Sequence, residues 1–492
     1  MAASGLVERP NSREKLRVMD LKLVIRLVVG ILVPLLLLWL PPAALGMPTM
    51  SVVEQRVVAI FILAALFWVL EPIPIWTTSV LVIVLMLLTC SDAGLIWLRQ
   101  DAGSQPLGEL LSHKAIMGTF ASPIIMLFIG GFFLAMAATK YRLDLNLARV
   151  LLKPFGQDTR HVLLGLMIIT AFFSMFMSNT ATTAMMLAIV APVLALFPPG
   201  DRGRAAFALA IPTAANIGGI GTPIGTPPNA IALKYLTGDN AISFSTWTSF
   251  AVPYVVVVLL LAWLLLLWLF PAGQKQMNLK IEGRFLKTPK AILVYVTFAV
   301  TVLLWLFDGF HGMNSNVVAM IPIAVFAMTK VITKDDLKKI SWDVLWLVAG
   351  GFAIGLGIEK TGLAQHLVDA IPFASWPAWG VMLGASALCL LMANFMSHTA
   401  TANLLLPIVA ALGGALSGLD AFGGQQALIL AVTWAASLGM SLPISTPPNA
   451  LAHATGYTNT ADMAKVGVIM GIVGMALAFV MLYVITQLGV IG

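Results

Sequence analysis

Residues 214–232 read AANIGGIGTPIGTPPNAIA, and this stretch decides the fold. It lies in apolar surroundings, but its four glycines and three prolines prevent one continuous helix. Pro227 and Pro228 suit the first turn of a new helix, because the N–H that proline lacks has no partner there. Within a membrane such a break is tolerated only where protein buries it or a water-filled cavity faces it. The stretch therefore predicts a broken helix that lines a site, with a new N-terminus that favours an anion.

The same pattern returns at residues 440–452, which read MSLPISTPPNALA. The two TPPNA motifs begin at Thr226 and Thr446, 220 positions apart. The pair Gly130-Gly131 matches Gly350-Gly351 at the same spacing. We infer that the chain contains two internal copies of about 220 residues each.

The composition is that of a polytopic membrane protein. Of the 492 residues, 60% are hydrophobic and 10% are charged, which lies outside the range of soluble globular proteins. The net charge is +7, but most Lys and Arg fall on the predicted cytoplasmic side, which indicates membrane orientation and no nucleic-acid partner. A basic tail at residues 1–26 precedes the first apolar run, and we expect it to be retained in the cytoplasm. Cys90 and Cys389 lie in apolar runs, which argues against a disulfide or a metal cluster.

Apolar segments predict eleven membrane crossings, two of them broken helices. The segments lie near residues 27–41, 52–70, 74–91, 117–138, 205–235 (broken), 248–270, 291–307, 316–329, 342–358, 426–455 (broken) and 465–489. With the basic N-terminal tail in the cytoplasm, an odd number of crossings puts the C-terminus on the extracytoplasmic side. The predicted fold is thus all-α, with about eleven transmembrane helices.

Two further apolar stretches, 161–197 and 376–415, are each divided by a polar tripeptide, Ser178-Asn179-Thr180 or Ser397-His398-Thr399. As two crossings, each would leave a polar turn at the membrane surface, so we expect re-entrant hairpins with tips at mid-membrane. Five crossings separate the hairpins, so they enter from opposite faces and the repeats are inverted, as in alternating-access transporters. The predicted organisation is a tail at 1–26, a first span with repeat 1 at 27–270, a cytoplasmic linker at 271–290 and repeat 2 at 291–492.

The polar side chains at the two tips and the two breaks are hydroxyls, amides and one imidazole, without Asp, Glu, Lys or Arg. A proton pump or a carrier of multivalent cations would be expected to hold carboxylates within the membrane. Hydroxyls, amides and freed carbonyls suit a monovalent cation, and hydroxyls with helix N-termini suit an anion. We favour an anion held beside a cation, because each charge lowers the desolvation cost of the other. Helix packing explains any single hydroxyl more simply, but it does not explain the paired set.

The paired tips, the paired TPPNA motifs and the whole-length repeat resemble the divalent anion/sodium symporter family, which includes sodium-coupled dicarboxylate and citrate transporters. The resemblance implies a homodimer in the cell (inner) membrane whose transport domains move like elevators against a scaffold, with sodium ion coupled to a small anionic metabolite. By the same resemblance, the substrate site would contain Asn179, Thr180, Thr226, Pro227, His398, Thr399, Thr446 and Pro447. The first sodium site would contain Ser174, Ser178, Asn179 and Gly225, and the second Ser397, His398 and Ser445.

The second half departs from the family pattern. His398 stands where the family has Asn, and Ala393 replaces the hydroxyl that Ser174 supplies in the first half. Imidazole is a poor ligand for an ion as hard as sodium. His398 could therefore replace the second sodium, bind a substrate carboxylate, or stand in for Asn as a neutral hydrogen-bond donor.

The leading hypothesis is sodium-coupled symport of a di- or tricarboxylate such as succinate, malate, fumarate or citrate. The alternative within transport is a sodium-independent dicarboxylate exchanger, which the altered second site favours. We expect no enzymatic activity: an intramembrane enzyme is a remote alternative, since Ser397 beside His398 is the only candidate nucleophile and base and no third group orients them. A receptor that binds the anion without transporting it would keep the same tips.

Overall fold

The computed structural model describes residues 12–100, 105–198, 200–277, 283–370, 376–416 and 418–492. These segments form α-helices and short 3₁₀ turns, and no β-strand occurs among them, so the predicted all-α class is confirmed. The first half contains α1 Ser12–Trp39, α2 Val52–Leu70, α3 Ile75–Thr89, α4 His113–Gly118, α5 Pro123–Lys140, α6 Leu143–Leu152, α7 Thr159–Ser174, α8 Asn179–Leu196, α9 Gly203–Gly219, α10 Pro227–Leu233 and α11 Phe244–Leu269. The second contains α12 Pro289–Leu306, α13 Asp308–His311, α14 Ser315–Met328, α15 Lys334–Leu337, α16 Trp342–Lys360, α17 Leu363–Ala370, α18 Ala378–Ala393, α19 His398–Ala415, α20 Gly424–Leu438, α21 Pro447–Ala454 and α22 Thr460–Gln487.

Both TPPNA segments interrupt a helix. Residues 220–226 separate α9 from α10, and residues 439–446 separate α20 from α21. The paired prolines occupy the first positions of α10 and α21, where their missing N–H groups cost no hydrogen bond. The polar tripeptides also end one helix and begin another, with Ser178 capping α8 and Ser397 capping α19. The four interruptions therefore lie within the predicted segments.

The helices form two runs in the same order, α5–α11 and α16–α22. Each helix of the second run begins about 220 residues after its counterpart, in agreement with the spacing of the motifs. The runs interlock, because α10 packs against α19 and α21 packs against α8. Each short helix thus contacts the tip helix of the opposite half. The inverted orientation of the two runs stays a prediction.

Glycines allow close contact between helices at equivalent places in the two halves. A Cβ atom on Gly130 of α5 would lie 2.7 Å from the Cβ of Ala319 on α14. A Cβ atom on Gly350 of α16 would lie 2.7 Å from the Cα of Ser79 on α3. Small residues of this kind let membrane helices approach until their backbones nearly touch. The repeated GG motif therefore packs α5 on α14 and α16 on α3.

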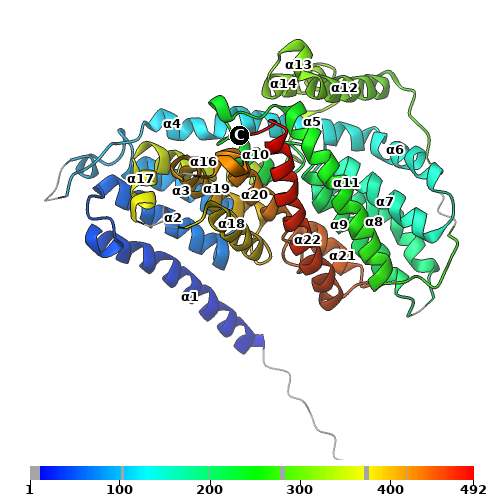
Figure 1. The fold of residues 1–492 in the computed structure, drawn as a ribbon, viewed down its shortest axis with the longest axis horizontal. Coiled ribbons are helices and arrows are strands. Elements are labelled where there is room, and N and C mark those ends of the chain that lie inside the picture. The colour runs from blue at the N-terminus through cyan, green and yellow to red at the C-terminus, as the bar shows by residue number, and fades with distance from the viewer. Residues whose placement is uncertain (1–11, 101–104, 199, 278–282, 371–375, 417) are drawn as a thin grey trace, which may run out of the picture.

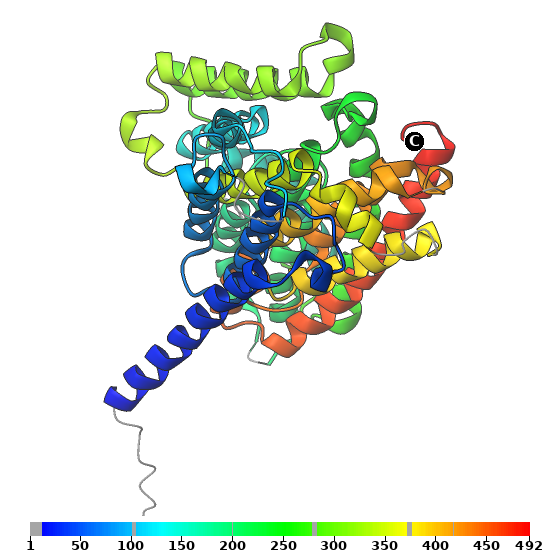
Figure 2. The same cartoon turned by 90° about the vertical axis from the view of Figure 1, so that its left-hand side faces the viewer.

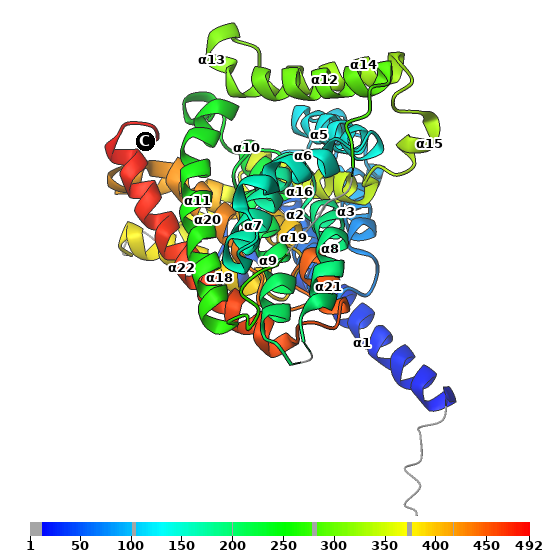
Figure 3. The same ribbon diagram turned by 90° about the vertical axis from the view of Figure 1, so that its right-hand side faces the viewer.

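Two elements stand out from the body of the molecule. The N-terminal end of α1 extends away from the other helices (Figures 1 and 2). Most of the described side chains of α1 from residue 21 onward are exposed. α12 and α14 lie along one edge (Figure 3), where α14 packs against α5. The exposed side chains of these helices are largely apolar, as expected for surfaces that face lipid.

Seven described helical segments are long and apolar enough to cross a membrane, among them α2, α11 and α22. The structure thus agrees with a membrane protein. α3 and α14, which we predicted to cross, have 15 and 14 residues. The predicted total of eleven crossings stays a prediction.

Some details differ from the sequence-based expectation. α1 begins at Ser12, inside the predicted tail at 1–26, because no Gly or Pro occurs between Ser12 and Gly30 to end a helix; residues 1–11 lie outside the described segments. The predicted linker at 271–290 overlaps the start of α12.

A half-buried lysine joins the two halves of the chain. Lys234 donates from Nζ to the carbonyl of Phe352 at 2.7 Å. The rings of Phe352 and Tyr235 lie 4.9 and 5.4 Å from the same Nζ atom, so cation–π contact and the hydrogen bond compensate its desolvation.

An ion pair fixes the segment that leads into α16. Lys140, at the end of α5, donates from Nζ to Asp336 Oδ2 at 2.5 Å and to the carbonyl of Val331 at 2.9 Å. Burial opposes ionisation of Asp336, but the hydrogen bonds from Lys140 and Thr333 outweigh it and lower its pKa to about 2. The charged pair holds α15 against α5 and so positions the N-terminus of α16.

Candidate functional site

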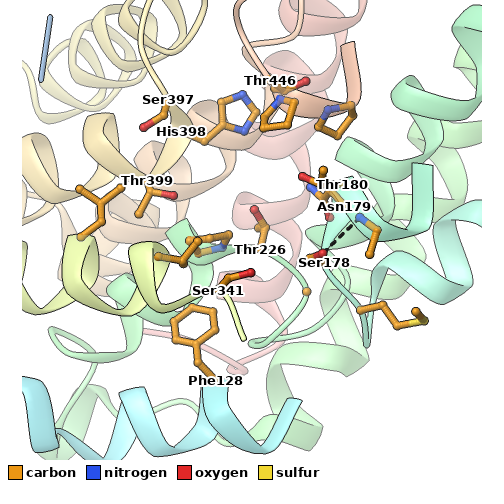
Figure 4. Close-up of a pocket in the computed structure, with 18 of the residues that line it drawn as sticks. Phe128, Ser178, Asn179, Thr180, Thr226, Ser341, Ser397, His398, Thr399 and Thr446 are labelled. Carbon is orange, nitrogen blue, oxygen red and sulfur yellow. Dashed lines mark hydrogen bonds between the residues drawn. The ribbon is translucent and has the colours of Figure 1, made fainter. Parts of the chain in front are cut away.

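One pocket gathers polar residues from both halves of the chain (Figure 4). Its volume is about 750 Å³. Thr180, Thr226, Thr399 and Thr446 all line it, although up to 266 positions separate them in the sequence. The structure therefore brings together the four threonines that the paired motifs singled out.

Four helices begin at this pocket, namely α8, α10, α19 and α21. Their N-cap residues Ser178, Thr226, Ser397 and Thr446 all line the cavity. The hydroxyls of Ser178 and Ser397 each accept a backbone N–H of their own helix, at 3.2 and 3.1 Å. The N-terminal end of a helix carries a partial positive charge. The pocket therefore favours an anion although no Lys or Arg lines it.

The asparagines of the TPPNA motifs stabilise the two breaks. Asn229 donates from Nδ2 to three backbone carbonyls within residues 219–222, at 2.8 to 3.2 Å. Asn449 donates from Nδ2 to two carbonyls within residues 440–442, at 2.7 and 3.0 Å. These carbonyls lose their helical partners where the helix ends, and an unpaired carbonyl in an apolar interior is costly. The sequence does not indicate which groups these amides contact, so this role is a finding of the structure.

A cluster of oxygen atoms lies behind the first tip. Ser174 Oγ is 2.6 Å from Asn179 Oδ1 and 2.8 Å from the carbonyl oxygen of Ala215, and one hydroxyl proton serves both contacts. A Cβ atom on Gly219 would lie 2.7 Å from Asn179 Oδ1 and 3.1 Å from the carbonyl oxygen of Gly225. The absent side chain of Gly219 thus leaves space between two oxygens. Oxygen atoms with unshared lone pairs around a small space suit a hard cation.

The equivalent place in the second half has a different chemistry. His398 Nε2 lies 2.7 Å from the carbonyl oxygen of Gly439, so Nε2 is the donor. Gly439 stands 220 positions after Gly219 in the sequence. Ala393 supplies no oxygen there, and the hydroxyl of Ser445 donates to the carbonyl of Asn394 at 2.8 Å. In the second half, where Ala393 replaces Ser174, the imidazole N–H of His398 therefore faces the carbonyl of Gly439.

The predicted site residues fall almost entirely on one cavity. Those that line it are Ser178, Asn179, Thr180, Gly225, Thr226, Pro227, Ser397, His398, Thr399, Ser445, Thr446 and Pro447. Ser174 does not line it, but reaches it through its hydrogen bond to Asn179. The side chains of Thr180, Thr226 and Thr399 make no hydrogen bond with any residue in the described part of the chain, so their hydroxyls are free to meet a ligand.

Sequence reasoning missed three polar residues of the pocket. Asn216 on α9 donates from Nδ2 to Thr446 Oγ1 at 3.3 Å and joins the two halves. Ser341 and Asp343 reach the pocket from the start of α16. Asp343 adds a carboxylate to the pocket from outside the tips and breaks, which themselves contain none. An amide within an apolar helix was the available signal for Asn216, whereas Ser341 and Asp343 read as the polar end of a membrane span. The remaining wall is largely apolar, with Ile75, Trp76, Phe128, Phe132, Phe176, Met177, Ile224, Val344 and Leu347.

Comparison with known proteins agrees with this geometry. Residues 21–489 match the family described as "Sodium:sulfate symporter transmembrane region". The chain belongs to this family. The family inferred from the paired motifs is thereby confirmed, and the chain is a multi-pass membrane protein of a transporter family.

Two relatives in this family have names that state an activity. The "Sodium-dependent dicarboxylate transporter SdcS" of Staphylococcus saprophyticus is 31% identical, over 84% of this chain and 82% of its own length. The "Sodium-dependent high-affinity dicarboxylate transporter 3" of Caenorhabditis elegans is 29% identical, over 82% of this chain and 78% of its own length. Both alignments span most of each protein.

Two solved structures have a similar fold. The Alcanivorax borkumensis YdaH transporter is 14% identical with a TM-score of 0.53, over 84% of this chain and 98% of that chain. Neisseria gonorrhoeae MtrF is 12% identical with a TM-score of 0.51, over 83% and 94%. At such low identity these similarities concern the fold alone.

Proposed function

We propose that this member of the sodium:sulfate symporter family carries a dicarboxylate into the cell together with sodium ion. The observation that carries the proposal is the pocket itself, in which helix N-termini and free threonine hydroxyls from both halves surround a cavity that no Lys or Arg lines. Such a site attracts an anion but needs a nearby cation to offset the anion's charge. The oxygen cluster around Asn179 offers a place for that cation.

The substrate's two carboxylates would meet the two halves of the pocket. Thr180 and Thr226 would donate hydroxyl hydrogen bonds from the first half, and Thr399 and Thr446 from the second. Asn179 would link substrate and sodium, because its side chain lies at both the pocket and the oxygen cluster. Pro227 and Pro447 would shape the walls at the starts of α10 and α21.

The substrate class is a small dicarboxylate such as succinate, malate or fumarate, with citrate as a larger candidate. A volume of about 750 Å³ is ample for such molecules and falls in the usual range of ligand pockets, about 300 to 1,000 Å³. The two relatives are named for sodium-dependent dicarboxylate transport, whereas the family description names sulfate. The spread of hydroxyls over two facing halves favours an anion with two separated carboxylates.

The sodium sites of the two halves would not be equivalent. The first would use Ser174, Ser178, Asn179 and Gly225, of which Ser174, Asn179 and the Gly225 carbonyl have oxygen atoms around one small space. In the second, at Ser397, His398 and Ser445, the imidazole N–H bonded to Gly439 would take the place of a cation beside that carbonyl. We therefore propose fewer bound sodium ions than two complete sites would hold.

The remaining features are proposals that follow from family membership and the repeat. The chain would act as a homodimer, and its hairpins and broken helices would move together as a transport domain between inverted repeats. The division into a tail at 1–26, repeat 1 within 27–270, a linker at 271–290 and repeat 2 at 291–492 is part of the same proposal. The N-terminus would lie in the cytoplasm and the C-terminus outside, in the cell (inner) membrane.

We also propose that the protein has no enzymatic activity. Ser397 and His398, the one candidate pair for nucleophile and base, are engaged elsewhere: Ser397 Oγ accepts the N–H of Ala400, and His398 Nε2 donates to Gly439. A nucleophile and its base must share a hydrogen bond to act together. The geometry therefore favours binding and transport.

Uptake of labelled succinate into proteoliposomes tests the proposal. We expect uptake that requires an inward sodium gradient and needs no succinate inside. Thr399→Val keeps the side-chain shape but removes one free hydroxyl, and losing a hydrogen bond to a charged group costs about 1.5 to 3 kcal/mol, so the affinity should fall about 10- to 100-fold. Thr301→Val is the matched control, because Thr301 is buried on α12 and donates only to Thr297 within its own helix. Uptake that ignores sodium would contradict the symport proposal.

A second candidate, sodium-independent dicarboxylate exchange, is favoured by the imidazole at His398 and the missing hydroxyl at Ala393. Exchange would show as uptake that needs succinate inside the vesicles and proceeds without sodium. His398→Asn separates the two candidates further, since it replaces the ring with an amide whose oxygen can bind sodium. For a symporter we expect the Hill coefficient for sodium to rise in this variant. An unchanged sodium response would show that His398 has no part in coupling.

A further inference from the structure

Asp343 places a carboxylate at the pocket, outside the paired motifs. It lies in the first turn of α16, is exposed, and lines the cavity together with the N-cap residue Ser341. Figure 4 shows Ser341 facing the same space as Thr226 and Thr399. Of the residues that line the pocket, Asp343 is the one with an Asp, Glu, Lys or Arg side chain. The anion-binding cavity therefore has a single fixed negative charge at its wall.

The charge of Asp343 is not neutralised within the described chain. Several other acidic side chains there have partners, such as Asp336 with Lys140 and Glu54 with His366. Asp343 makes no ion pair or side-chain hydrogen bond with any described residue. Asp343 lies in the first turn of α16, at the positive end of the helix dipole, which is a usual place for a carboxylate. An exposed, unpaired carboxylate at the rim is therefore available to act on the ligand.

The position of Asp343 allows its charge to repel a bound anion without the side chain shaping the binding surface. α16 packs against α3 and also against the hairpin helix α19, but Asp343 itself lies in neither a hairpin nor a broken helix. A low-dielectric cleft concentrates the field of a charge at its wall. The repulsion between Asp343 and a bound anion grows in proportion to the anion's charge. Helix N-termini would attract the anion while Asp343 opposes each additional negative charge.

We propose that Asp343 is a specificity-determining residue that limits the charge of the accepted anion. It favours a divalent dicarboxylate over a fully ionised tricarboxylate of similar length. The inference rests on the proposed function, because it assigns a charge preference to the same anion site. Selection of this kind uses a repulsive element against the wrong ligand as well as attraction for the right one.

Binding of a charge series to the purified protein tests the inference. Succinamate, succinate and tricarballylate carry one, two and three carboxylates, and at pH 8 all of these are ionised. With a charge separation of about 10 Å and an effective dielectric constant of about 40 to 80, Asp343→Asn should strengthen binding about two- to fourfold per ligand charge. The ratio of tricarballylate to succinate affinity should therefore rise about two- to fourfold. The measurement belongs in low salt, where screening is weakest.

A matched control separates a local effect from net charge. Asp335→Asn removes the same charge from an exposed side chain that pairs with Lys338 and does not line the pocket. This variant should leave the affinity ratios unchanged. Equal changes for all three ligands in Asp343→Asn, or the same ratio shift in both variants, would overturn the inference.

Changing the charge after folding covers the case in which Asp343→Asn fails to fold. Asp343→Cys can be modified with a positively or a negatively charged methanethiosulfonate, while the native Cys90 and Cys389 are fully buried. The positive reagent should raise the tricarballylate preference, and the negative reagent should restore the wild-type ratio. Identical ratios after both reagents would contradict the inference. Wild-type protein that binds and transports none of the three would instead refute the proposed function, and the inference would fall with it.

Discussion

Asn229 and Asn449 have the same role at two places 220 positions apart. Each side-chain amide donates to backbone carbonyls that the adjacent break leaves without helical partners. The pocket needs the breaks, because they supply the helix N-termini that face the ligand. The two asparagines therefore stabilise the site without lining it.

Asn229→Asp tests this role with almost no change in shape. The substitution replaces an N–H₂ donor with a carboxylate oxygen that faces two or three carbonyl oxygens, so a hydrogen-bonded group becomes a repelled one. We expect a loss of at least about 1 to 3 kcal/mol in stability, together with a loss of succinate binding. Asn314→Asp is the control, because Asn314 is an exposed N-cap residue and Asp caps a helix equally well. Thermal unfolding of the purified variants measures both effects, and an unchanged melting temperature in Asn229→Asp would contradict the role.

The sequence predicts the pocket residues that belong to a repeated motif, but it does not predict those that occur only once. Thr226 and Thr446 were found because their motifs recur in register, and the structure brings both to one pocket. Asn216 and Asp343 have no polar counterpart in the other half, since residue 436 is Ala and the residue 220 positions before Asp343 is Pro123. Their place at the pocket depends on tertiary packing between α9, α21 and α16, which a single sequence does not specify.

At the scale of elements, paired glycines set the distance between helices. Gly350 of α16 faces Ser79 of α3 so closely that an added Cβ atom would require the backbone to move. Gly384 lies within α18, and an added Cβ atom there would meet nothing within 4 Å. Alanine favours the helix more than glycine does at both positions, so a difference between the two substitutions reports the effect of packing alone.

Gly350→Ala and Gly384→Ala form a matched pair. We expect Gly350→Ala to destabilise the protein by about 1 to 3 kcal/mol, as is typical of overpacking. Gly384→Ala should be neutral or stabilise by up to about 1 kcal/mol through helix propensity. Thermal unfolding in detergent measures the difference between the variants. If both variants melt at the same temperature, the close contact between α16 and α3 does not set the stability.

Element boundaries were predicted well where a breaker residue marks them. Pro227 and Pro447 mark the starts of α10 and α21, and both helices begin there. Hydropathy does not give the start of α1, because the charged residues after Ser12 are compatible with a helix and no breaker precedes Gly30. Hydropathy reports where a chain prefers lipid, whereas helix formation continues until backbone geometry stops it.

At the scale of the molecule, the helices divide into two sets that meet at the pocket. One set contains α2, α3, α5, α14 and α16, and the other contains the hairpin and broken helices with α11 and α22; α16 also packs against α19, so the two sets share a further contact beside the pocket. The pocket takes Asp343 and Phe128 from the first set and its threonines from the second. Lys234, the C-cap residue of α10, donates across the boundary to the carbonyl of Phe352 on α16. Motion of one set against the other would have to break this contact and change the wall that the ligand meets.

Distance measurements between spin labels test whether the two sets move as rigid bodies. Val296 on α12, beside the first set, and Ile472 on α22, in the second, are exposed positions suited to labelling. Alternating access by rigid-body motion predicts a second distance population between them when sodium and succinate are added. A pair within the second set, at Phe172 of α7 and Ile472, should keep one distance under all conditions. Labelled protein diluted with unlabelled protein isolates distances within one protomer. If the Val296–Ile472 distance stays unchanged with every ligand while uptake persists, access must alternate by local gating at the pocket and not by movement of a whole domain.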